Sequence, residues 1–367
     1  MSCKESVDLK YCCWEARAIS RKTRKLEHIK YALELPDAVS PSGFGDMYLV
    51  HNALPELNRG GVDCAISFMG KQLRAPLMIN AITGGHAGVL EINRGLARAA
   101  AACGIAMAVG SQRAALDDPA VRDTFAVTRE ENPDGLILAN LSALCTPDEA
   151  LEAINMIDAD GIQLYLNVNQ ELAMREGDTD FRGVLANIRS LVQNLPVPVV
   201  VKEVGCGLAR ETVVALYQAG VSCIDVSGRG GTNFAAIESR RGGSGGAYLE
   251  QWGIPTAVSL LEALSTGLPL VVIASGGLRS AVDIAVALAA GASMTAMAGP
   301  FLRALQAGGT EGLAGYINDL IAGLQRVMML TGAENLAALA GKPLVITGFT
   351  AEWLRRRGVD IDCYARR

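Results

Sequence analysis

Glycines and neutral polar residues follow several short apolar runs of the chain. Gly276 and Gly277 come after one run and stand directly before a predicted helix at residues 281–289. Glycines let a phosphate approach the backbone closely, and the first turn of a helix offers free N–H groups and a favourable dipole. Gly299 after the next run and Thr232 after an earlier one extend this set. Two glycines alone would also make a tight turn, but the combination favours a bound phosphate.

Lys202 ends another apolar run, so its amino group is predicted to point into the mouth of the sheet. A structural interpretation is an ion pair with Glu203, or an amino group that reaches for water. The functional interpretations are a positive charge against an anionic cofactor ring, or a Schiff base. Thr83, Ser111 and Asn140 at neighbouring run ends are neutral hydrogen-bonding groups. They fit a neutral heterocycle better than a Schiff-base substrate.

Glu171 follows a further run, close to Asn167 and Gln170. Beside a diphosphate, one carboxylate can help to hold Mg²⁺ because phosphate and water oxygens complete the coordination. A glutamate at a helix start is more often simply solvated. Its place at the end of an apolar run favours the metal interpretation here.

The chain has three histidines, His28, His51 and His86, and none of them ends the second to eighth apolar run. A Ser/His/Asp triad and a histidine-based metal site are therefore not predicted. His28 lies close to Arg24 and Lys25 in the sequence. A surface histidine is usually incidental, but these three residues together suit an anion.

Eight apolar runs alternate with helical patterns, which is typical of a parallel sheet covered by helices. Eight such units favour the α/β class and a closed (β/α)8 TIM barrel over an open doubly wound sheet. Barrel enzymes bind their ligands at the carboxyl ends of the strands, where the residues named above fall. The predicted strands are residues 76–80, 105–109, 136–140, 162–167, 197–202, 223–227, 270–274 and 294–298.

Two regions fall outside this repeat. We expect residues 1–20 to be a disordered extension, 21–74 an N-terminal arm and cap, and 75–367 the barrel. Residues 228–252 are rich in glycine and predict a long lid loop, since loops of this length usually bind ligands or are disordered. Residues 313–329 predict a helix, and 342–363 a segment on the outside of the barrel.

Composition narrows the class of protein. The chain has 367 residues, of which half are hydrophobic, and a formal net charge of −5. This acidic balance argues against nucleic acid as a partner. We find neither a signal sequence nor a membrane segment. Nine scattered cysteines without CxxC spacing suggest reduced thiols and a cytoplasmic protein.

Nine short motifs occur in an order that resembles the type 2 isopentenyl diphosphate isomerases, a family that uses flavin mononucleotide (FMN). The resemblance runs from about residue 21 to the C-terminus. It implies a barrel that binds FMN, NADPH or NADH as reductant, Mg²⁺ and a small prenyl diphosphate, and that assembles as a homotetramer or homo-octamer. The reaction it implies moves the double bond of isopentenyl diphosphate to give dimethylallyl diphosphate, without net redox change. The motifs are RKLEHI, NAITGG, VGSQR, LANL, LNVNQE, VPVVVKEVG, GGTNF, ASGG and MAG.

The resemblance also assigns roles to residues of this chain. It implies that Gln170 and Lys202 are catalytic and that Glu171 binds the metal. The residues it implies for the substrate are Arg24, Lys25, His28, Ser111, Gln112, Arg113, Asn167 and Gln170. The residues it implies for the flavin are Ile82, Thr83, Gly84, Ser111, Asn140, Lys202, Ser227, Thr232, Gly276, Gly277, Leu278, Arg279, Ala298 and Gly299.

Three other functions remain open at this stage. An FMN-dependent 2-hydroxy-acid oxidoreductase would need a basic histidine near the flavin, and no strand end offers one. A flavin- or phosphate-binding protein without catalysis is opposed by the presence of Gln170, Glu171 and Lys202. An enzyme with a shifted prenyl diphosphate substrate is the third alternative.

Tyr165 departs from the pattern of the family, which has histidine at this position. Tyrosine keeps ring bulk and a hydrogen-bonding tip, but it lacks the cationic form that faces a diphosphate near neutral pH. We therefore predict that Tyr165→His preserves or raises turnover of isopentenyl diphosphate in a steady-state assay. A large loss of turnover would instead show that the rest of the pocket is adapted to tyrosine.

Overall fold

Eight parallel strands form a closed barrel in this computed structural model, which describes residues 24–35, 41–243 and 246–367. Each of the eight predicted apolar runs overlaps one strand, so the barrel prediction is confirmed. The predicted extension at residues 1–20 lies outside the described residues. The strands are β4 (Leu77–Ile79), β5 (Ala106–Ala108), β6 (Ile137–Ser142), β7 (Gly161–Leu166), β8 (Val199–Glu203), β9 (Cys223–Asp225), β10 (Val271–Ser275) and β11 (Met294–Met297).

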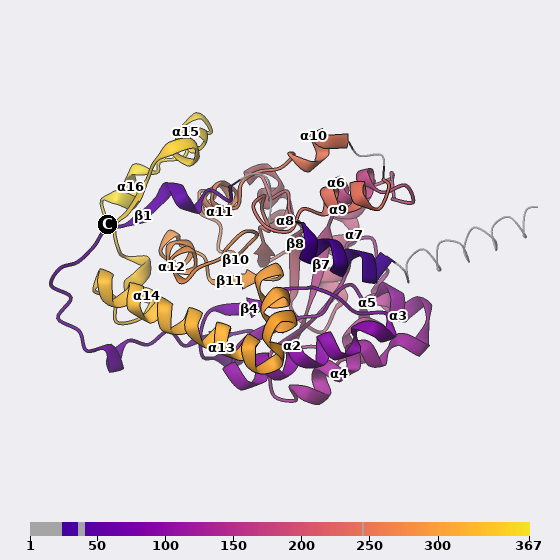
Figure 1. Ribbon diagram of the computed structural model, residues 1–367. Helices are drawn as coiled ribbons and strands as arrows, with labels where there is room; N and C mark the ends of the chain where they lie inside the picture. Colours follow the sequence, from indigo (N-terminus) through magenta and orange to yellow (C-terminus); the bar gives the residue numbers. More distant parts are fainter. Residues whose placement is uncertain (1–23, 36–40, 244–245) are drawn as a thin grey trace, which may run out of the picture.

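Pairing between the last strand and the first closes the barrel. Met78 on β4 lies beside Ala296 on β11 and beside Ala106 on β5. The other strands pair in chain order, each parallel to the next. This closure rules out the open doubly wound sheet. All eight strands therefore deliver their carboxyl ends to one rim, which the loops of the site share (Figure 1).

Side chains inside the barrel form a small apolar cluster of their own. Met78, Val200, Ile273 and Met294 belong to it, and their neighbours in each strand face the surrounding helices instead. The antiparallel hairpin of β2 (Ile66–Phe68) and β3 (Lys71–Leu73) adds Phe68 and Leu73 to this inner cluster. The hairpin thus closes the end of the barrel opposite the strand ends that carry polar residues.

The helices that follow the strands cover the outside of the barrel. The sequence pattern predicts six helices between the strands, and all six are present, with bounds shifted by three residues at most. The predicted ranges are 91–102, 147–157, 181–193, 210–218, 256–264 and 281–289. Thr146 and Ser280 each start their helix with a capping box, in which side chain and backbone satisfy each other. These six helices are α2 (Leu90–Cys103), α5 (Pro147–Met156), α7 (Val184–Asn194), α8 (Arg210–Gln218), α11 (Thr256–Leu264) and α12 (Ala281–Ala290).

The C-terminal part of the chain packs against the barrel from outside. The predicted helix at residues 313–329 is part of the longer α13 (Gly299–Thr331), which bends at Gly309 where φ is +63°. The segment 342–363 holds β12 (Leu344–Ile346), which pairs with β1 (Met47–Leu49), and α15 (Gly348–Arg356), which contacts α11. Its expected place on the outside is confirmed.

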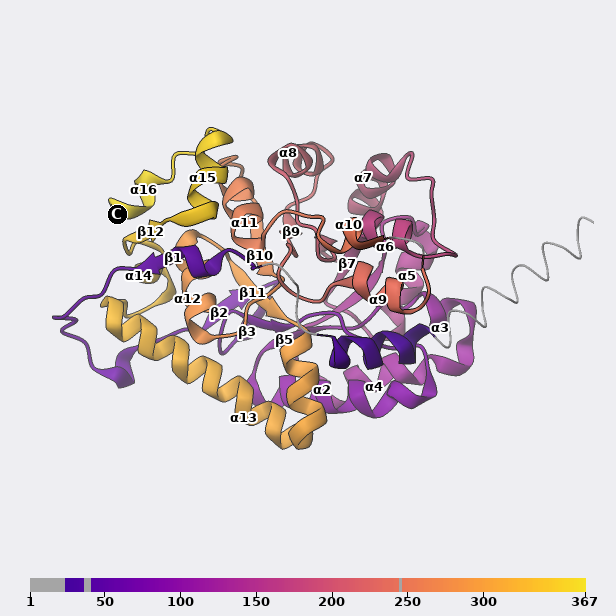
Figure 2. The same ribbon diagram turned by 45° about the horizontal axis from the view of Figure 1, so that its top comes forward.

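Two segments far apart in the chain meet over the polar rim. Residues 24–34 form a helix, here called the arm helix, and its His28 ring lies 6.1 Å from the ring of Phe234. Phe234 begins α9 (Phe234–Arg240), which with α10 (Gly246–Glu250) lies within the predicted lid loop. Both lid helices contact α6 (Val168–Ala173), the short helix after β7 (Figure 2). Within the described chain, no helix combines the length and apolarity that a membrane crossing requires.

The turn after β4 depends on two glycines. Gly84 has φ +149°, and a Cβ there would lie 2.0 Å from the Phe125 ring on α4 (Asp123–Glu131). Gly85 has φ +84° and donates its N–H to Thr124 at 2.8 Å. Phe125 is fully buried beneath this turn. Gly84 is therefore required for steric reasons, because the turn rests directly on the aromatic ring.

We expect Phe125→Ala to lower the free energy of unfolding by about 3–5 kcal/mol, since it leaves a cavity beneath a turn that cannot collapse. Urea unfolding followed by circular dichroism measures this change. Phe349→Ala is the matched control because Phe349 is 56% exposed, and its cost should stay below about 1 kcal/mol. Equal costs for the two variants would contradict this account of the turn.

Candidate active site

Two adjoining cavities open at the polar rim of the barrel. The first measures about 920 Å³ with its open mouth and lies toward the ends of β9, β10 and β11. The second measures about 1540 Å³ and lies toward the ends of β5, β6 and β7. Both cavities are lined by Lys202, Ile82 and His28. They are thus two parts of one site, with the amino group of Lys202 on their shared wall.

Glycines shape the wall of the first cavity. Gly276 and Gly277 have φ of +100° and +80°, and a Cβ on either residue would lie within 2.4 Å of a carbonyl oxygen of the loop after β9. Arg279 braces this turn, since its guanidinium donates to the carbonyls of Gly277 at 2.9 Å and Gly230 at 2.8 Å. Only glycine permits so close an approach of the two loops. Their backbones, rather than side chains, face the cavity.

Lys202 belongs to a buried polar network inside the barrel. Its amino group donates to Ser227 Oγ at 3.0 Å and to the Glu203 carbonyl at 2.6 Å. Asp225, fully buried on the next strand, accepts from Asn80 Nδ2 at 2.8 Å and from Ser275 Oγ at 2.6 Å. Burial lowers the pKa of Lys202, and the nearby carboxylate of Asp225 opposes that shift. The carboxylates of Asp225 and Glu203 thus favour the protonated amine at the cavity wall, against the effect of burial.

Asn140 joins this network from the other side of the barrel. Its Nδ2 donates to Gln163 Oε1 at 2.8 Å, and Gln163 Nε2 donates to Asn80 Oδ1 at 3.0 Å. A chain of hydrogen bonds therefore runs from β6 across the barrel to Asp225 on β9. Sequence reasoning singled out Asn140 but missed Asn80, Gln163, Asp225 and Ser275 as members. The polar residues within otherwise apolar strands were the available signal.

The second cavity combines cations of the arm helix with polar groups of the strand ends. Lys25 Nζ donates to the Ser111 carbonyl at 3.3 Å, and Tyr165 shares a hydrogen bond of 3.2 Å with Ser111 Oγ. Burial, with Arg24 beside it, lowers the pKa of Lys25 to about 7. Burial also raises the pKa of Tyr165. Lys25 is therefore the one of these groups whose charge changes near neutral pH.

Glu171 also lines the second cavity, from helix α6 after β7. Its carboxylate accepts from Asn167 Nδ2 at 2.7 Å and from the Asp178 N–H at 2.9 Å. Among the described residues, no three His, Cys, Asp or Glu side chains are grouped to hold a metal ion. Glu171 would thus act as a single protein ligand, with the remaining positions left to phosphate and water oxygens.

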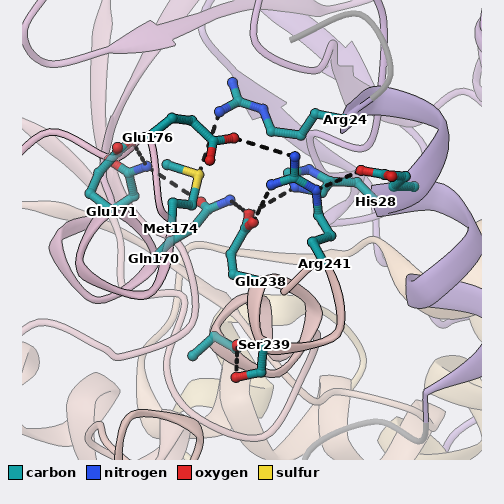
Figure 3. A network of polar contacts seen from close by, with 12 residues as sticks. Arg24, His28, Gln170, Glu171, Met174, Glu176, Glu238, Ser239 and Arg241 are labelled. Carbon is teal, nitrogen blue, oxygen red and sulfur yellow. Dashed lines mark hydrogen bonds and ion pairs between the residues drawn. The ribbon is translucent and has the colours of Figure 1, made fainter. Parts of the chain in front are cut away.

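Glu238 on α9 is the residue that sequence reasoning missed at this rim. It is 1% exposed, and its Oε1 accepts from His28 Nε2 at 2.8 Å and from Gln170 Nε2 at 3.0 Å (Figure 3). Arg241, one turn further on, pairs with its other oxygen. Burial opposes ionisation of Glu238, but these donors outweigh it and lower its pKa to about 2. Helical spacing of Phe234, Glu238 and Arg241 within a glycine-rich loop was the available signal.

Most of the residues implied by the resemblance line the two cavities. They are Arg24, Lys25, His28, Ile82, Ser111, Arg113, Asn140, Asn167, Gln170, Glu171, Lys202, Ser227, Thr232, Gly276, Gly277, Leu278, Ala298 and Gly299. Arg113 lies at the edge of the second cavity and already pairs with Asp117 at 3.1 Å and Glu149 at 2.5 Å. Any anion there would share this guanidinium with two carboxylates.

Four of the implied residues do not line either cavity. Gln112 is fully buried, where Nε2 donates to the Ala153 carbonyl at 2.8 Å and Oε1 accepts from the Asn140 N–H. It positions Asn140 rather than facing a substrate. Gly84 rests on Phe125 and Arg279 braces the glycine turn, as described above. Thr83 is buried, and its Oγ1 has no hydrogen-bond partner among the described residues.

Comparison with known proteins gives two kinds of match. A protein from Moorella thermoacetica named isopentenyl-diphosphate delta-isomerase is 52% identical over 343 residues, which cover 94% of this chain and 99% of the relative. One of the same name from Methanothermobacter thermautotrophicus is 42% identical over 94% of this chain and 99% of the relative. The chain belongs to the isopentenyl-diphosphate delta-isomerase family. Residues 138–346 of this isomerase also match the family model described as FMN-dependent dehydrogenase.

Solved structures of oxidases share the barrel of this isomerase. Mandelate oxidase with (S)-2-phenylpropionate superposes with a TM-score of 0.63 at 17% identity, over 90% of this chain and 98% of that one. A lactate oxidase of Pediococcus acidilactici gives a TM-score of 0.62 at 18% identity, over 88% of this chain and 87% of that one. At such identity the likeness concerns the fold alone.

The low pKa of Lys25 predicts how binding of inorganic pyrophosphate depends on pH. In the free protein Lys25 loses its proton as the pH rises through about 7, whereas a bound anion favours the protonated form. Above that pH, binding must therefore also take up a proton. We expect affinity to fall by up to about tenfold per pH unit between about pH 7 and about pH 9. Isothermal titration calorimetry on the Mg²⁺-containing protein measures the dissociation constant.

Lys25→Arg is the matched control because arginine stays charged throughout this range. Dividing the wild-type dissociation constant by that of Lys25→Arg removes the titration of pyrophosphate itself. A ratio that does not change with pH would show that Lys25 is charged throughout or does not contact the anion.

Proposed function

We propose that this protein converts isopentenyl diphosphate to dimethylallyl diphosphate with bound FMN and Mg²⁺, and that NADPH or NADH reduces the flavin. The observation that carries this proposal is the shared wall of the two cavities at Lys202. On one side stand glycine backbones suited to a phosphate, and on the other stand the arm cations with Gln170 and Glu171. This arrangement occurs in a chain with isomerase relatives along nearly its whole length.

The residues of the first cavity fit FMN. The backbone of Gly276 and Gly277 and the start of α13 at Gly299 would hold the phosphate. Lys202, on the wall that both cavities share, offers a positive charge beside the ring. Bound FMN in its reduced form supplies an electron-rich ring system that acts as an acid–base or electronic partner.

The second cavity fits a diphosphate and a divalent cation. Arg24, Lys25 and His28 approach it from the arm helix, and Ser111 and Arg113 from the loop after β5. Their donors would bind the phosphate oxygens. Glu171 would hold Mg²⁺, because Asn167 and the Asp178 N–H already orient its carboxylate.

We assign Gln170, which lines the second cavity, to the hydrocarbon end of such a substrate, and Glu238 to the support of Gln170. The reaction removes one proton from the substrate carbon chain and adds one elsewhere, so no electrons are gained or lost overall. Gln170 has no titrating proton, but its Nε2 is held on the ionised Glu238 at 3.0 Å. Glu238 thereby fixes which face of the Gln170 amide points into the cavity. This fixed amide is what Gln170 contributes to the reaction.

Two further features belong to the proposal. We propose a cytoplasmic protein that assembles as a homotetramer or homo-octamer, on the basis of the resemblance given above. Its partners are small molecules rather than nucleic acid or a membrane.

An FMN-dependent 2-hydroxy-acid oxidoreductase is the competing function, and it would need a basic histidine near the flavin. The only histidine within the described residues that lines the two cavities is His28, and it is bound to Glu238.

Turnover by the purified flavoprotein tests the proposal. With FMN, a reductant, Mg²⁺ and isopentenyl diphosphate, we expect dimethylallyl diphosphate as product. Lys202→Met should lower kcat/KM by about 100-fold or more, because it removes a preorganised charge from the site. Lys71→Met is the matched control, since Lys71 lies on the hairpin at the opposite end of the barrel. Product formation is followed by chromatography of the hydrolysed prenyl alcohols.

Two results would contradict the proposal in different ways. A protein that never acquires flavin absorbance, even with added FMN, would exclude every flavin-dependent function. A protein that binds FMN and is reduced but forms no product would exclude the isomerase activity. In that case, reduction of the flavin by 2-hydroxy acids would support the oxidoreductase.

A further inference from the structure

We propose that Arg241 is a positioning residue that fastens the arm helix and the loop after α6 to the lid helix α9, and so completes the diphosphate site. Its guanidinium reaches three carboxylates on three separate segments of the chain. Nε lies 2.8 Å from Glu27 of the arm helix, and one terminal nitrogen lies 3.3 Å from Glu176 in the loop after α6. The other terminal nitrogen pairs with Glu238 of α9 itself.

The burial of this cluster makes the contact more than a surface ion pair. The Arg241 side chain is 9% exposed, and Glu238 is 1% exposed. Glu176 is 26% exposed and Glu27 is 45% exposed. Removing the cation takes a partner from the buried carboxylate of Glu238 and leaves the carboxylates of Glu27 and Glu176 facing it without an opposite charge between them. The arm helix and the loop after α6 would then separate from α9.

The local backbone directs Arg241 to this place. Helix α9 ends immediately before Arg241, and Gly242 follows with φ +85°. A Cβ on Gly243 would lie 2.1 Å from the Ala173 carbonyl at the end of α6. The glycine pair thus lets the end of α9 touch α6. From that position Arg241 reaches the loop after α6 and the arm helix together (Figure 3).

Arginine is specifically suited to this role. Each of its three guanidinium nitrogens meets a different carboxylate. Lysine has one nitrogen and would bridge fewer partners at these distances. The arm helix carries Arg24, Lys25 and His28 into the cavity. Fastening the helix through Glu27, which stands between Lys25 and His28 in the sequence, sets the position of these groups, although Arg241 itself lines neither cavity.

Arg241→Gln tests this inference. We expect the dissociation constant for inorganic pyrophosphate with Mg²⁺ to rise about 10- to 100-fold, as the loss of buried charged hydrogen bonds implies. Hydrogen exchange of the amides at residues 24–34, followed by mass spectrometry on the holoenzyme, should become faster. A third measurement, turnover, rests on the proposed function. There we expect KM for isopentenyl diphosphate to rise by a larger factor than kcat falls. Arg240→Gln is the matched control because Arg240 is the exposed neighbour.

Glu27→Gln provides a second and milder test. It removes one contact of the clamp from the arm side, so exchange in the arm helix should rise and the affinity for pyrophosphate should fall. In an Arg241→Gln background it should have no further effect, because the two residues act through one contact. Glu34→Gln, at an exposed position of the same helix, should leave exchange and affinity unchanged. Arg241→Lys should restore part of the affinity and less than all of it.

The outcomes separate the inference from the proposed function. The inference is wrong if Arg241→Gln changes the affinity for pyrophosphate and the exchange of the arm helix no more than Arg240→Gln does. It is also wrong if Glu27→Gln lowers the affinity as much in the Arg241→Gln background as in the wild type. If Arg241→Gln does not fold, Glu27→Gln decides, and unchanged exchange of the arm helix overturns the inference. A wild-type protein without isomerase activity, whose arm helix nevertheless loosens in Arg241→Gln and Glu27→Gln, would leave the clamp in place and contradict only the proposed function.

Discussion

The fully buried carboxylate of Asp225 is the constraint around which the barrel is arranged. A carboxylate in the centre of an apolar barrel is tolerated only when donors surround it. Asn80, Ser275 and the Ser227 N–H supply hydrogen bonds, and Lys202 supplies the opposite charge. Each of these partners lies within two residues of the end of a strand. The need to satisfy one buried charge therefore fixes how four strand ends face one another, and with them the wall that both cavities share.

A second group of charged residues lies at the rim, outside this network. Its members come from helices and loops rather than from strands. There the carboxylate of Glu238 is provided by the lid, and its partners come from the arm helix and the helix after β7. The barrel itself contributes only Gln170, through the short α6. Contacts between loops are less constrained than contacts between strands, because loops open at lower free energy. The site thus has a rigid inner layer, formed by Asp225 and Lys202 within the barrel. In its outer layer, ion pairs and hydrogen bonds connect the arm helix, α6 and α9.

The fold could be predicted well because parallel barrel strands are buried on both faces and read as continuous apolar runs. The helices at residues 210–218 and 256–264 were predicted to the residue. The site was predicted where its residues end a strand, as Lys202 and Ser227 do. Glu238 was not predicted as a site residue, because it lies on a short helix inside a glycine-rich segment that was predicted to be a loop. Gln112 and Arg279 were expected to contact ligands, but both side chains hydrogen-bond to the protein instead. A position near the end of a strand does not determine whether a side chain points into the cavity or toward neighbouring residues.

The hairpin of β2 and β3 has a consequence for how ligands come and go. It closes the end of the barrel opposite the polar rim with Phe68 and Leu73, so ligands of the described cavities enter and leave at the rim. The arm helix contributes His28, Ile29 and Ala32 to the first cavity and Arg24 and Lys25 to the second. The arm helix therefore borders the way into both cavities. Any contact that holds this helix in place also limits how fast ligands enter and leave the site.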